Sequence, residues 1–336
     1  MTSSIIAAPT ITVLMSCFNA ARWLEESINS VLKQSYTDFE FIIVDDGSAD
    51  NTLDIIYRFA AMDSRIVAIK KSNSGLSDSL NVGLKIAKGE WIARLDADDV
   101  CEPTRLEKQA ELAFANSNLV FIGTGLTIID DAGNKVIIYD YPADHAGLLQ
   151  HLRTSRKFPP HSSVLYRTKI VRNLCGYRSR FHQAEDWDLW LRLSEVGELA
   201  CLSMPLVQIR KHAEQISHSE GGRRQMIDSR LATVSYWLRY FQMPDPVEAD
   251  EIDFKKFSAW IELHLQKNGF FEFQEHKAYL ISLVNDALSS SLGIIRLVCV
   301  CIEKPILTLR FFREQLVGES ITRRLALEWI RQSKVS

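Results

Sequence analysis

Residues 90–99 read EWIARLDADD, a short and mostly apolar run that ends in three aspartates within four positions. A continuous apolar run of this length is typical of a strand buried on both faces in a parallel sheet. Residues 39–48, FEFIIVDDGS, follow the same pattern. Each stretch therefore predicts a buried strand that carries carboxylates at its carboxyl end.

The segments around these two stretches alternate between strand and helix patterns. Strands are expected over 11–15, 39–44, 65–69 and 90–95, and each is followed by apolar residues at helical spacing. Such alternation predicts an α/β fold, a Rossmann-like and mostly parallel sheet with helices on both faces. Ligands bind such sheets beyond the carboxyl ends of the strands, which here carry the polar residues.

After residue 118 the pattern changes. Residues 120–129 and 135–139 predict two strands joined by a hairpin loop, and 162–167 predict another. A helix is expected from Glu185, and from about residue 222 the chain reads as helical. We therefore expect a catalytic domain over 1–218 and a helical C-terminal region over 219–336, which would contact an acceptor, a second copy or a membrane surface.

The composition is that of an ordinary globular chain, 46% hydrophobic and 24% charged over 336 residues. Its net charge of −3 provides no basic field for nucleic acid. Six cysteines without a CxxC pair favour a reducing compartment. Because no apolar run reaches about 18 residues, we expect a cytoplasmic protein, either free or peripheral at the inner face of the cell membrane. The mixed apolar and basic segment 288–316 could lie in that interface, pack on the catalytic domain or dimerise.

Four carboxylates fall within seven residues: Asp96, Asp98, Asp99 and Glu102. Unpaired like charges about 4–6 Å apart cost on the order of 1 kcal/mol per pair. A divalent cation removes that cost, and hard oxygen ligands favour Mg²⁺ or Mn²⁺. The alternative is a solvated turn in which Asp99 caps the next helix.

A second acidic pair, Asp45 and Asp46, could accept hydrogen bonds from a nucleobase or a ribose, and Gly47 would allow close approach. The alternative is an ordinary strand-to-helix loop with Ser48 or Asp50 as its N-cap.

Glu185 and Asp186 open a helix, where acidic residues are favourable by about 0.3–1 kcal/mol through the helix dipole. A purely structural role is therefore open to them, and so is that of a general base. Asp188, a third acid, exceeds what capping needs. Trp187 and Trp190 beside them suit either stacking on a sugar ring or a place in the core.

Five segments, in this order, resemble the family-2 inverting glycosyltransferases with the GT-A fold, and the resemblance covers roughly residues 9–217. The segments are PTITV at 9–13 with CFN at 17–19, FIIVDDGS at 41–48, NSGL at 73–76 with LN at 80–81, GEWIARLDADD at 89–99, and AEDWDLW at 184–190.

The resemblance implies a role for each matching residue. Asp98 in the family's DxD element and His212 would ligate Mn²⁺ or Mg²⁺. Asp186 matches the catalytic base, with Glu185 as the less favoured choice, and His161 and Trp187 would lie on the acceptor side. Contacts to the nucleotide-sugar would come from Pro9, Ser16, Asn19, Asp45 or Asp46, Asn73 and Asp96.

The implied activity is a metal-dependent, inverting transfer of a hexose from a nucleotide-sugar, expected to be a UDP-sugar, to a saccharide or lipid-linked acceptor in surface polysaccharide synthesis. One departure is Leu80, where many relatives have an arginine that contacts the diphosphate. Two alternatives stay open: an inert nucleotide-sugar-binding protein, which would lack the base or the metal ligands, and a sugar nucleotidyltransferase. Residues 16–20 lack the glycines typical of the latter.

Overall fold

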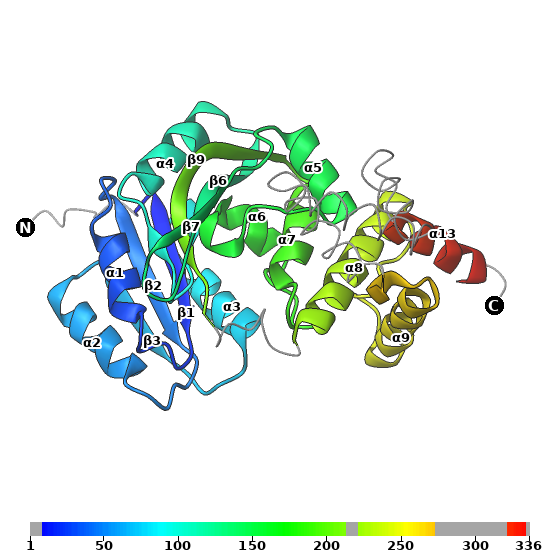
Figure 1. The fold of residues 1–336 in the computed structure, drawn as a ribbon, viewed down its shortest axis with the longest axis horizontal. Helices are drawn as coiled ribbons and strands as arrows, with labels where there is room; N and C mark the ends of the chain where they lie inside the picture. The colour runs from blue at the N-terminus through cyan, green and yellow to red at the C-terminus, as the bar shows by residue number, and fades with distance from the viewer. Residues whose placement is uncertain (1–8, 213–220, 273–320, 334–336) are drawn as a thin grey trace, which may run out of the picture. The chain divides into compact units, whose positions relative to one another are not determined.

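The computed structural model describes residues 9–212, 221–272 and 321–333 (Figure 1). The chain divides into two compact units, Met1–Ala232 and Thr233–Ser336. The domain boundary expected between residues 218 and 219 lies outside the described residues. The segment 288–316, for which an interfacial or packing role was expected, lies outside them too.

The first unit is built on a nine-stranded sheet with the order β3-β2-β1-β4-β8-β6-β9-β5, in which β7 pairs with β6. The four strands expected in the N-terminal half are confirmed, and β1 runs parallel to β2 and β4 while β2 runs parallel to β3. Their bounds are β1 Ile11–Cys17, β2 Phe39–Asp45, β3 Ile66–Lys70 and β4 Trp91–Arg94.

Helices cover both faces of this parallel part, as expected. Successive side chains of a strand point to opposite faces, so that Val13 and Met15 of β1 join the core cluster that contains α1 and α4. Leu14 points the other way, where its side chain contacts Gly83 of α3 so closely that any Cβ there would clash. The helices are α1 Leu24–Leu32, α2 Thr52–Met62, α3 Leu76–Ile86 and α4 Arg105–Ala115.

The second half of the sheet is mixed. β8 (Leu165–Arg167) pairs antiparallel with both β4 and β6 (Leu119–Ile129), and β7 (Lys135–Tyr139) forms the expected hairpin with β6. The first part of the strand expected over 162–167 is instead a 3₁₀ turn, η1 His161–Ser163. Three helices complete this half: α5 His145–Thr154, α6 Thr168–Asn173 and α7 Glu185–Leu193.

β9 (Glu198–Arg210) was not among the predicted strands, although it is the longest and runs parallel to β6. Proline breaks a strand pattern because it cannot donate to the ladder. Pro205 is tolerated because it lies where the register with β6 shifts, opposite Gly125. β9 also pairs with the short strand β5 (Val100–Cys101) and delivers Arg210 to the site.

α8 (Gly221–Tyr240) begins in the first unit and ends in the second. In the second unit, α9 (Glu251–Lys267) packs on α13 (Ile321–Ser333), with the Phe257 and Trp329 ring centroids 4.9 Å apart. Within the described part of the chain, no helix has the length and apolar character that a membrane span requires.

Candidate active site

Residues far apart in the sequence meet at the carboxyl edge of β1, β2 and β4. Cys17 and Asp45, the last residues of β1 and β2, are in register. The buried thiol of Cys17 reports on its surroundings: burial raises its pKa, and the negative charges of Asp45, Asp96 and Asp98 raise it further. The carboxylates expected at the donor site therefore surround one point at the end of β1.

The two acids after β2 have different surroundings. Asp46 is buried and accepts hydrogen bonds from Lys71 Nζ at 2.5 Å and from the backbone N–H groups of Ser74 and Gly75 at 3.0 and 2.9 Å. Burial acts to raise the pKa of Asp46, but these hydrogen bonds outweigh it and the pKa is lowered. Asp45 has only long contacts with the backbone N–H of Ser48, at 3.3 and 3.4 Å. Asp46 thus fixes the following loop, whereas Asp45 is fully buried and has weaker side-chain contacts among the described residues.

Asn19 and Gly47 shape the loops at this edge. Asn19 has a left-handed backbone (φ 49°), which asparagine tolerates, and its Oδ1 accepts a hydrogen bond from the Ala49 N–H at 2.8 Å. Gly47 (φ 76°) lies so close to Asn73 that a Cβ would be 2.8 Å from the Asn73 backbone nitrogen. The loops after β1, β2 and β3 therefore pack together, and Ser16 lies beside them.

Pro9 does not reach this edge. It precedes β1, whereas Ser16 and Asn19 follow from the other end of the same strand. A strand of seven residues separates the two ends by about 20 Å. The structure thus separates Pro9 from the other residues expected to contact the nucleotide-sugar.

All four carboxylates in the loop after β4 contact neighbouring groups. Asp96 forms an ion pair with the fully buried Arg94, with Nη2 2.5 Å from Oδ1. The Ser162 hydroxyl lies 2.7 Å from Asp96 Oδ2 and 2.5 Å from Asp99 Oδ2. Glu102 accepts a hydrogen bond from Gln208 of β9.

Asp99 is buried beside two other acids of the same loop. Burial, and then the charges of Asp98 and Asp96, raise the pKa of Asp99 well above its usual range. The Ser162 hydroxyl lies within hydrogen-bond distance of both carboxylates and also accepts a hydrogen bond from the Asp96 backbone N–H at 3.0 Å. The alternative role of Asp99 as a helix cap is not observed, since α4 begins at Arg105 after Thr104.

Asp98 pairs with His212, which follows β9. Asp98 Oδ2 lies 2.8 Å from His212 Nε2, and the two side chains are 27% and 8% exposed. Burial and Asp96 raise the pKa of Asp98, while His212 acts to lower it. Arg210 holds the pair in place, because its backbone N–H donates to Asp99 Oδ1 at 3.0 Å and its Nε donates to the Asp98 carbonyl at 3.1 Å.

The Asp98–His212 pair fits a hard divalent cation. The carboxylate oxygen suits Mn²⁺ or Mg²⁺, whereas the imidazole nitrogen is a softer ligand that Mn²⁺ accepts more readily than Mg²⁺. Among the described residues there is no group of three or more histidine, cysteine or acidic side chains that could hold a metal. Ligands beyond this pair would therefore come from substrate oxygens and water, as is usual for cations bound to phosphates.

Glu185 and Asp186, at the start of α7, form the second acidic centre. Burial, and then the neighbouring Asp186, raise the pKa of Glu185 to about 8. The pKa of Asp186 is raised to about 6. Burial is the main cause and the charge of Asp96 adds to it, while the hydrogen bond from the Trp187 N–H at 2.6 Å acts to lower the pKa. At neutral pH, Glu185 therefore keeps its proton and Asp186 is mostly ionised.

His161 lies behind this pair. Its Nδ1 is 3.9 Å from Glu185 Oε1, and its Nε2 is 2.8 Å from the Tyr177 hydroxyl. Burial, and then the nearby Arg94, lower the pKa of His161 well below its usual range. His161 is thus a neutral, buried side chain that contacts the acidic pair from below the surface.

Asp188 has a structural role. Its fully buried carboxylate accepts hydrogen bonds from Arg178 Nε at 3.0 Å and from Arg192 Nε at 2.9 Å. Arg192 also donates to the carbonyls of Leu174 and Gly176. The third acid of α7 therefore anchors the helix to the preceding segment.

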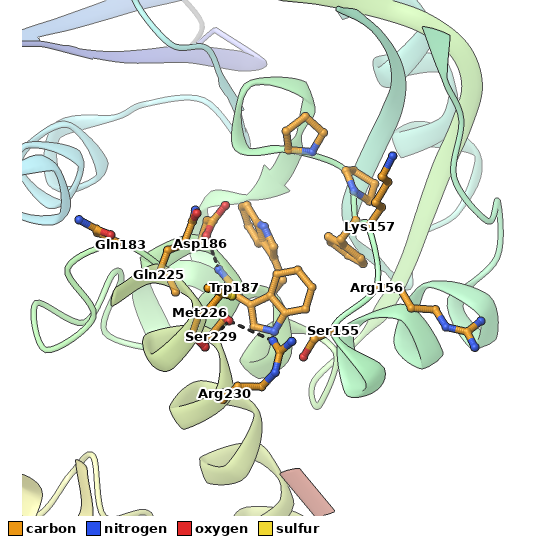
Figure 2. Close-up of a pocket in the computed structure, with 15 residues that line it drawn as sticks. Ser155, Arg156, Lys157, Gln183, Asp186, Trp187, Gln225, Met226, Ser229 and Arg230 are labelled. Atoms are coloured by element: carbon orange, nitrogen blue, oxygen red, sulfur yellow. Dashed lines mark hydrogen bonds between the residues drawn. The ribbon is translucent and has the colours of Figure 1, made fainter. Parts of the chain in front are cut away.

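A cavity of about 370 Å³ opens beside Asp186 (Figure 2). Aromatic side chains form part of its wall, with the rings of Phe158 and Trp187 6.0 Å apart at a steep angle. Trp190 also lines it and is almost fully buried. The structure thus brings Asp186 and Trp187 to one cavity.

Two residues of the site had no recognised signal in the sequence. Ser162 links Asp96 to Asp99, and Arg94 carries the buried charge that Asp96 and Asp186 both experience. An arginine inside an apolar strand is itself unusual, because a fully buried charge needs a partner. That anomaly in residues 90–95 was the available signal for Arg94.

The family model described as "Glycosyl transferase family 2" matches residues 12–175. The putative glycosyltransferase EpsE of Bacillus subtilis is 39% identical over 197 residues, which are 57% of this chain and 69% of EpsE. The O-antigen biosynthesis glycosyltransferase WbnJ of Escherichia coli is 32% identical, over 54% of this chain and 71% of WbnJ.

Among solved structures, S. aureus TarS 1–349 in complex with UDP-GlcNAc has a TM-score of 0.58 at 18% identity, with 96% of this chain and 92% of that chain covered. A longer TarS structure is covered over 43% of its length. This likeness confirms the GT-A type of fold. From its relatives and the matching family model, the chain belongs to glycosyl transferase family 2.

Proposed function

We propose that the protein is a metal-dependent, inverting glycosyltransferase that moves a hexose from a UDP-sugar to a saccharide or lipid-linked acceptor in surface polysaccharide synthesis. The observation that carries this proposal is the position of Asp96. The negative charge of Asp96 raises the pKa of Asp98, in the loop after β4, and also that of Asp186, which lines the cavity. Asp96 is therefore near both acids. A nucleotide-sugar held between them would have its reacting carbon near both.

The donor half of the site is assigned to the carboxyl edge of the sheet. Asp45 would accept hydrogen bonds from the uracil or the ribose, since Asp46 is engaged with Lys71 and the following loop. Ser16, Asn19 and Asn73 border the same space, and Asp96 would lie toward the ribose. The UDP-GlcNAc bound to TarS and the O-antigen role in the name of WbnJ support this donor class and this pathway type.

Asp98 and His212 would hold a Mn²⁺ or Mg²⁺ ion. When bound, the cation supplies Lewis-acid stabilisation of the departing diphosphate. The protein contributes a preformed pair of ligands, because Arg210 fixes the loop that carries Asp98.

Asp186 would act as the general base that removes the proton from the acceptor hydroxyl. It is mostly ionised at neutral pH and lines the cavity, whereas Glu185 keeps its proton. Asp188 is engaged with two arginines and cannot serve as a nucleophile. A single available carboxylate supports single displacement with inversion at the anomeric carbon.

The C-terminal helical region, residues 219–336, is assigned to contacts with the acceptor, with a second copy or with the inner face of the cell membrane. The four residues of α8 that line the cavity beside Asp186 support the acceptor role: Gln225, Met226, Ser229 and Arg230.

A nucleotide screen tests the proposal. Thermal unfolding is followed with UDP, GDP, CDP, ADP and dTDP, each with Mn²⁺, with Mg²⁺ or with EDTA. We expect UDP with a divalent cation to raise the melting temperature most, and UDP-sugars then to be consumed in the presence of saccharide acceptors. Stabilisation without turnover would favour an inert binding protein, and turnover of a nucleoside triphosphate with a sugar phosphate would favour a nucleotidyltransferase.

A further inference from the structure

The cavity beside Asp186 is lined by an excess of positive charge. Among the described residues, the basic ones that line it are Arg156, Lys157 and Arg230, and Asp186 is the one acidic residue. The remaining polar lining residues are neutral, among them Gln183 and Gln225. A cavity with this balance favours a negative group on its ligand.

The two cations that matter most lie on different walls. Arg230 comes from α8 and is half-buried, and Figure 2 shows its side chain extending toward Trp187 and Ser155. Lys157 comes from the segment after α5, with its Nζ 3.7 Å from the centre of the Tyr139 ring. No carboxylate of the described residues lies within 4.0 Å of the Lys157 ammonium, as an ion pair would require. Arg156 extends away from Trp187 in the same view.

The segment that carries Lys157 has a fixed backbone. Ser155 has a left-handed conformation (φ 51°) at the end of α5, where its N–H donates to the Leu152 carbonyl. The Arg156 N–H donates to the His151 carbonyl at 2.9 Å, and His151 Nδ1 lies 2.7 Å from the Lys157 carbonyl. Hydrogen bonds of the fold therefore fix the backbone that carries Lys157.

We propose that this cavity binds an acceptor sugar that carries a carboxylate or a phosphate beside the hydroxyl that reacts. The proposal rests on the proposed function, in which Asp186 is the base. Charge-assisted hydrogen bonds from Arg230 and Lys157 would hold the negative group, and the aromatic wall would stack on the apolar face of the sugar ring. The same cations offset the repulsion between the acceptor's negative group and Asp186.

Matched glycosides that differ in charge test the proposal. The probes are methyl β-glucuronide, methyl β-glucoside 6-phosphate and neutral methyl β-glucoside, titrated into the full chain with UDP and Mg²⁺ and followed by ligand-observed NMR. At low salt we expect whichever of the two charged glycosides binds more tightly to have at least about tenfold higher affinity than the neutral one. Whether the carboxylate or the phosphate binds better identifies the group. The preference should shrink toward unity near 1 M salt, where the Debye length is about 3 Å.

Two variants locate the effect. Arg230→Gln and Lys157→Gln should each reduce the charge preference severalfold, while Lys85→Gln, an exposed cation on α3, should not change it. The thermal shift produced by UDP checks that each variant is folded. Equal affinity for the three glycosides, no binding of either charged one, or a preference that survives both variants would overturn the proposal. If UDP fails to stabilise the wild-type chain, the proposed function falls first, and this proposal with it.

Discussion

His212 Nε2 lies 2.8 Å from Asp98 Oδ2, although the two residues are 114 positions apart in the chain. The contact depends on β9, whose last residue, Arg210, donates from its backbone N–H to the Asp99 carboxylate and from its Nε to the Asp98 carbonyl. Trp23 adds a further constraint, because its ring centroid is 4.2 Å from that of His212. The pair is therefore held by the fold before any ligand binds.

Replacing Asp98 tests whether this pair binds a cation. In the wild-type chain, Mn²⁺ should add to the thermal stabilisation given by UDP, because Asp98 would hold an ion that offsets the charge of the diphosphate. In Asp98→Asn, we expect that added stabilisation to be lost and turnover to fall by at least about a hundredfold. Both are measured by thermal unfolding and by UDP release, with Mn²⁺ and with EDTA.

Asp99→Asn is the matched control, since Asp99 is next to Asp98 in the chain but its carboxyl group contacts Ser162 and the Arg210 backbone N–H rather than His212. It should keep the Mn²⁺ dependence. If Asp98→Asn keeps it as well, the cation site has been assigned to the wrong residues.

Two variants decide between the acids that open α7. Asp186→Asn should keep UDP binding and lower turnover by about 10²–10⁴-fold, the usual contribution of a general base. Glu185→Gln should retain most of the activity, because Glu185 is protonated at neutral pH and the amide is a close substitute. Turnover is measured as UDP release from a UDP-sugar with acceptor present. The reverse outcome would make Glu185 the base.

The pH dependence of turnover should follow Asp186. A base must be unprotonated to act, so activity should rise with pH through about 6 and level off above it. At pH 5 the rate should be about a tenth of the plateau, as expected one unit below the pKa. A kcat/KM profile measures this limb.

Glu185→Gln serves as the reference for that profile, because the uncharged acid it replaces contributes no charge near pH 6. The kcat/KM of Glu185→Gln should still rise with pH through about 6. A limb near pH 8 in the wild type that disappears in Glu185→Gln would contradict the assignment.

The parallel half of the fold was predictable from local signals. The apolar run 39–44 belongs to a strand whose residues are all buried. The helical spacing of Leu24, Ile28 and Val31 marks the buried face of a helix. β9 was not predictable in this way, since its contacts with β6 are made far along the chain and Pro205 interrupts its pattern. Its place in the sheet depends on tertiary pairing rather than on local sequence preference.

The candidate site was predictable in its residue types but not in their division of labour. The residue types alone did not separate the roles of the six acids at the two loops, and the partners of each distinguish them. Asp46 is tied to Lys71 and Asp99 to Ser162 and Arg210, while Asp45 has only long contacts with Ser48 among the described residues and Asp98 pairs with His212. Such partners come from distant segments, which no local pattern identifies.

Asp188 provides a prediction for stability rather than activity. Its carboxylate is fully buried between Arg178 and Arg192. Removing one member of a buried charge cluster leaves the others uncompensated, which costs about 3–5 kcal/mol. We therefore expect Asp188→Ala to lower the melting temperature of the first unit strongly, by several degrees or more.

Asp78→Ala is the comparison, because Asp78 also pairs with a cation, Lys71, but is half exposed. An exposed ion pair contributes about 0–1 kcal/mol, so this variant should unfold close to the wild-type temperature. Adding Arg178→Met to Asp188→Ala should recover part of the loss, since it removes one of the uncompensated charges. Equal melting temperatures for Asp188→Ala and Asp78→Ala would mean that Asp188 does not anchor α7, and a role in the reaction would then have to be considered for it.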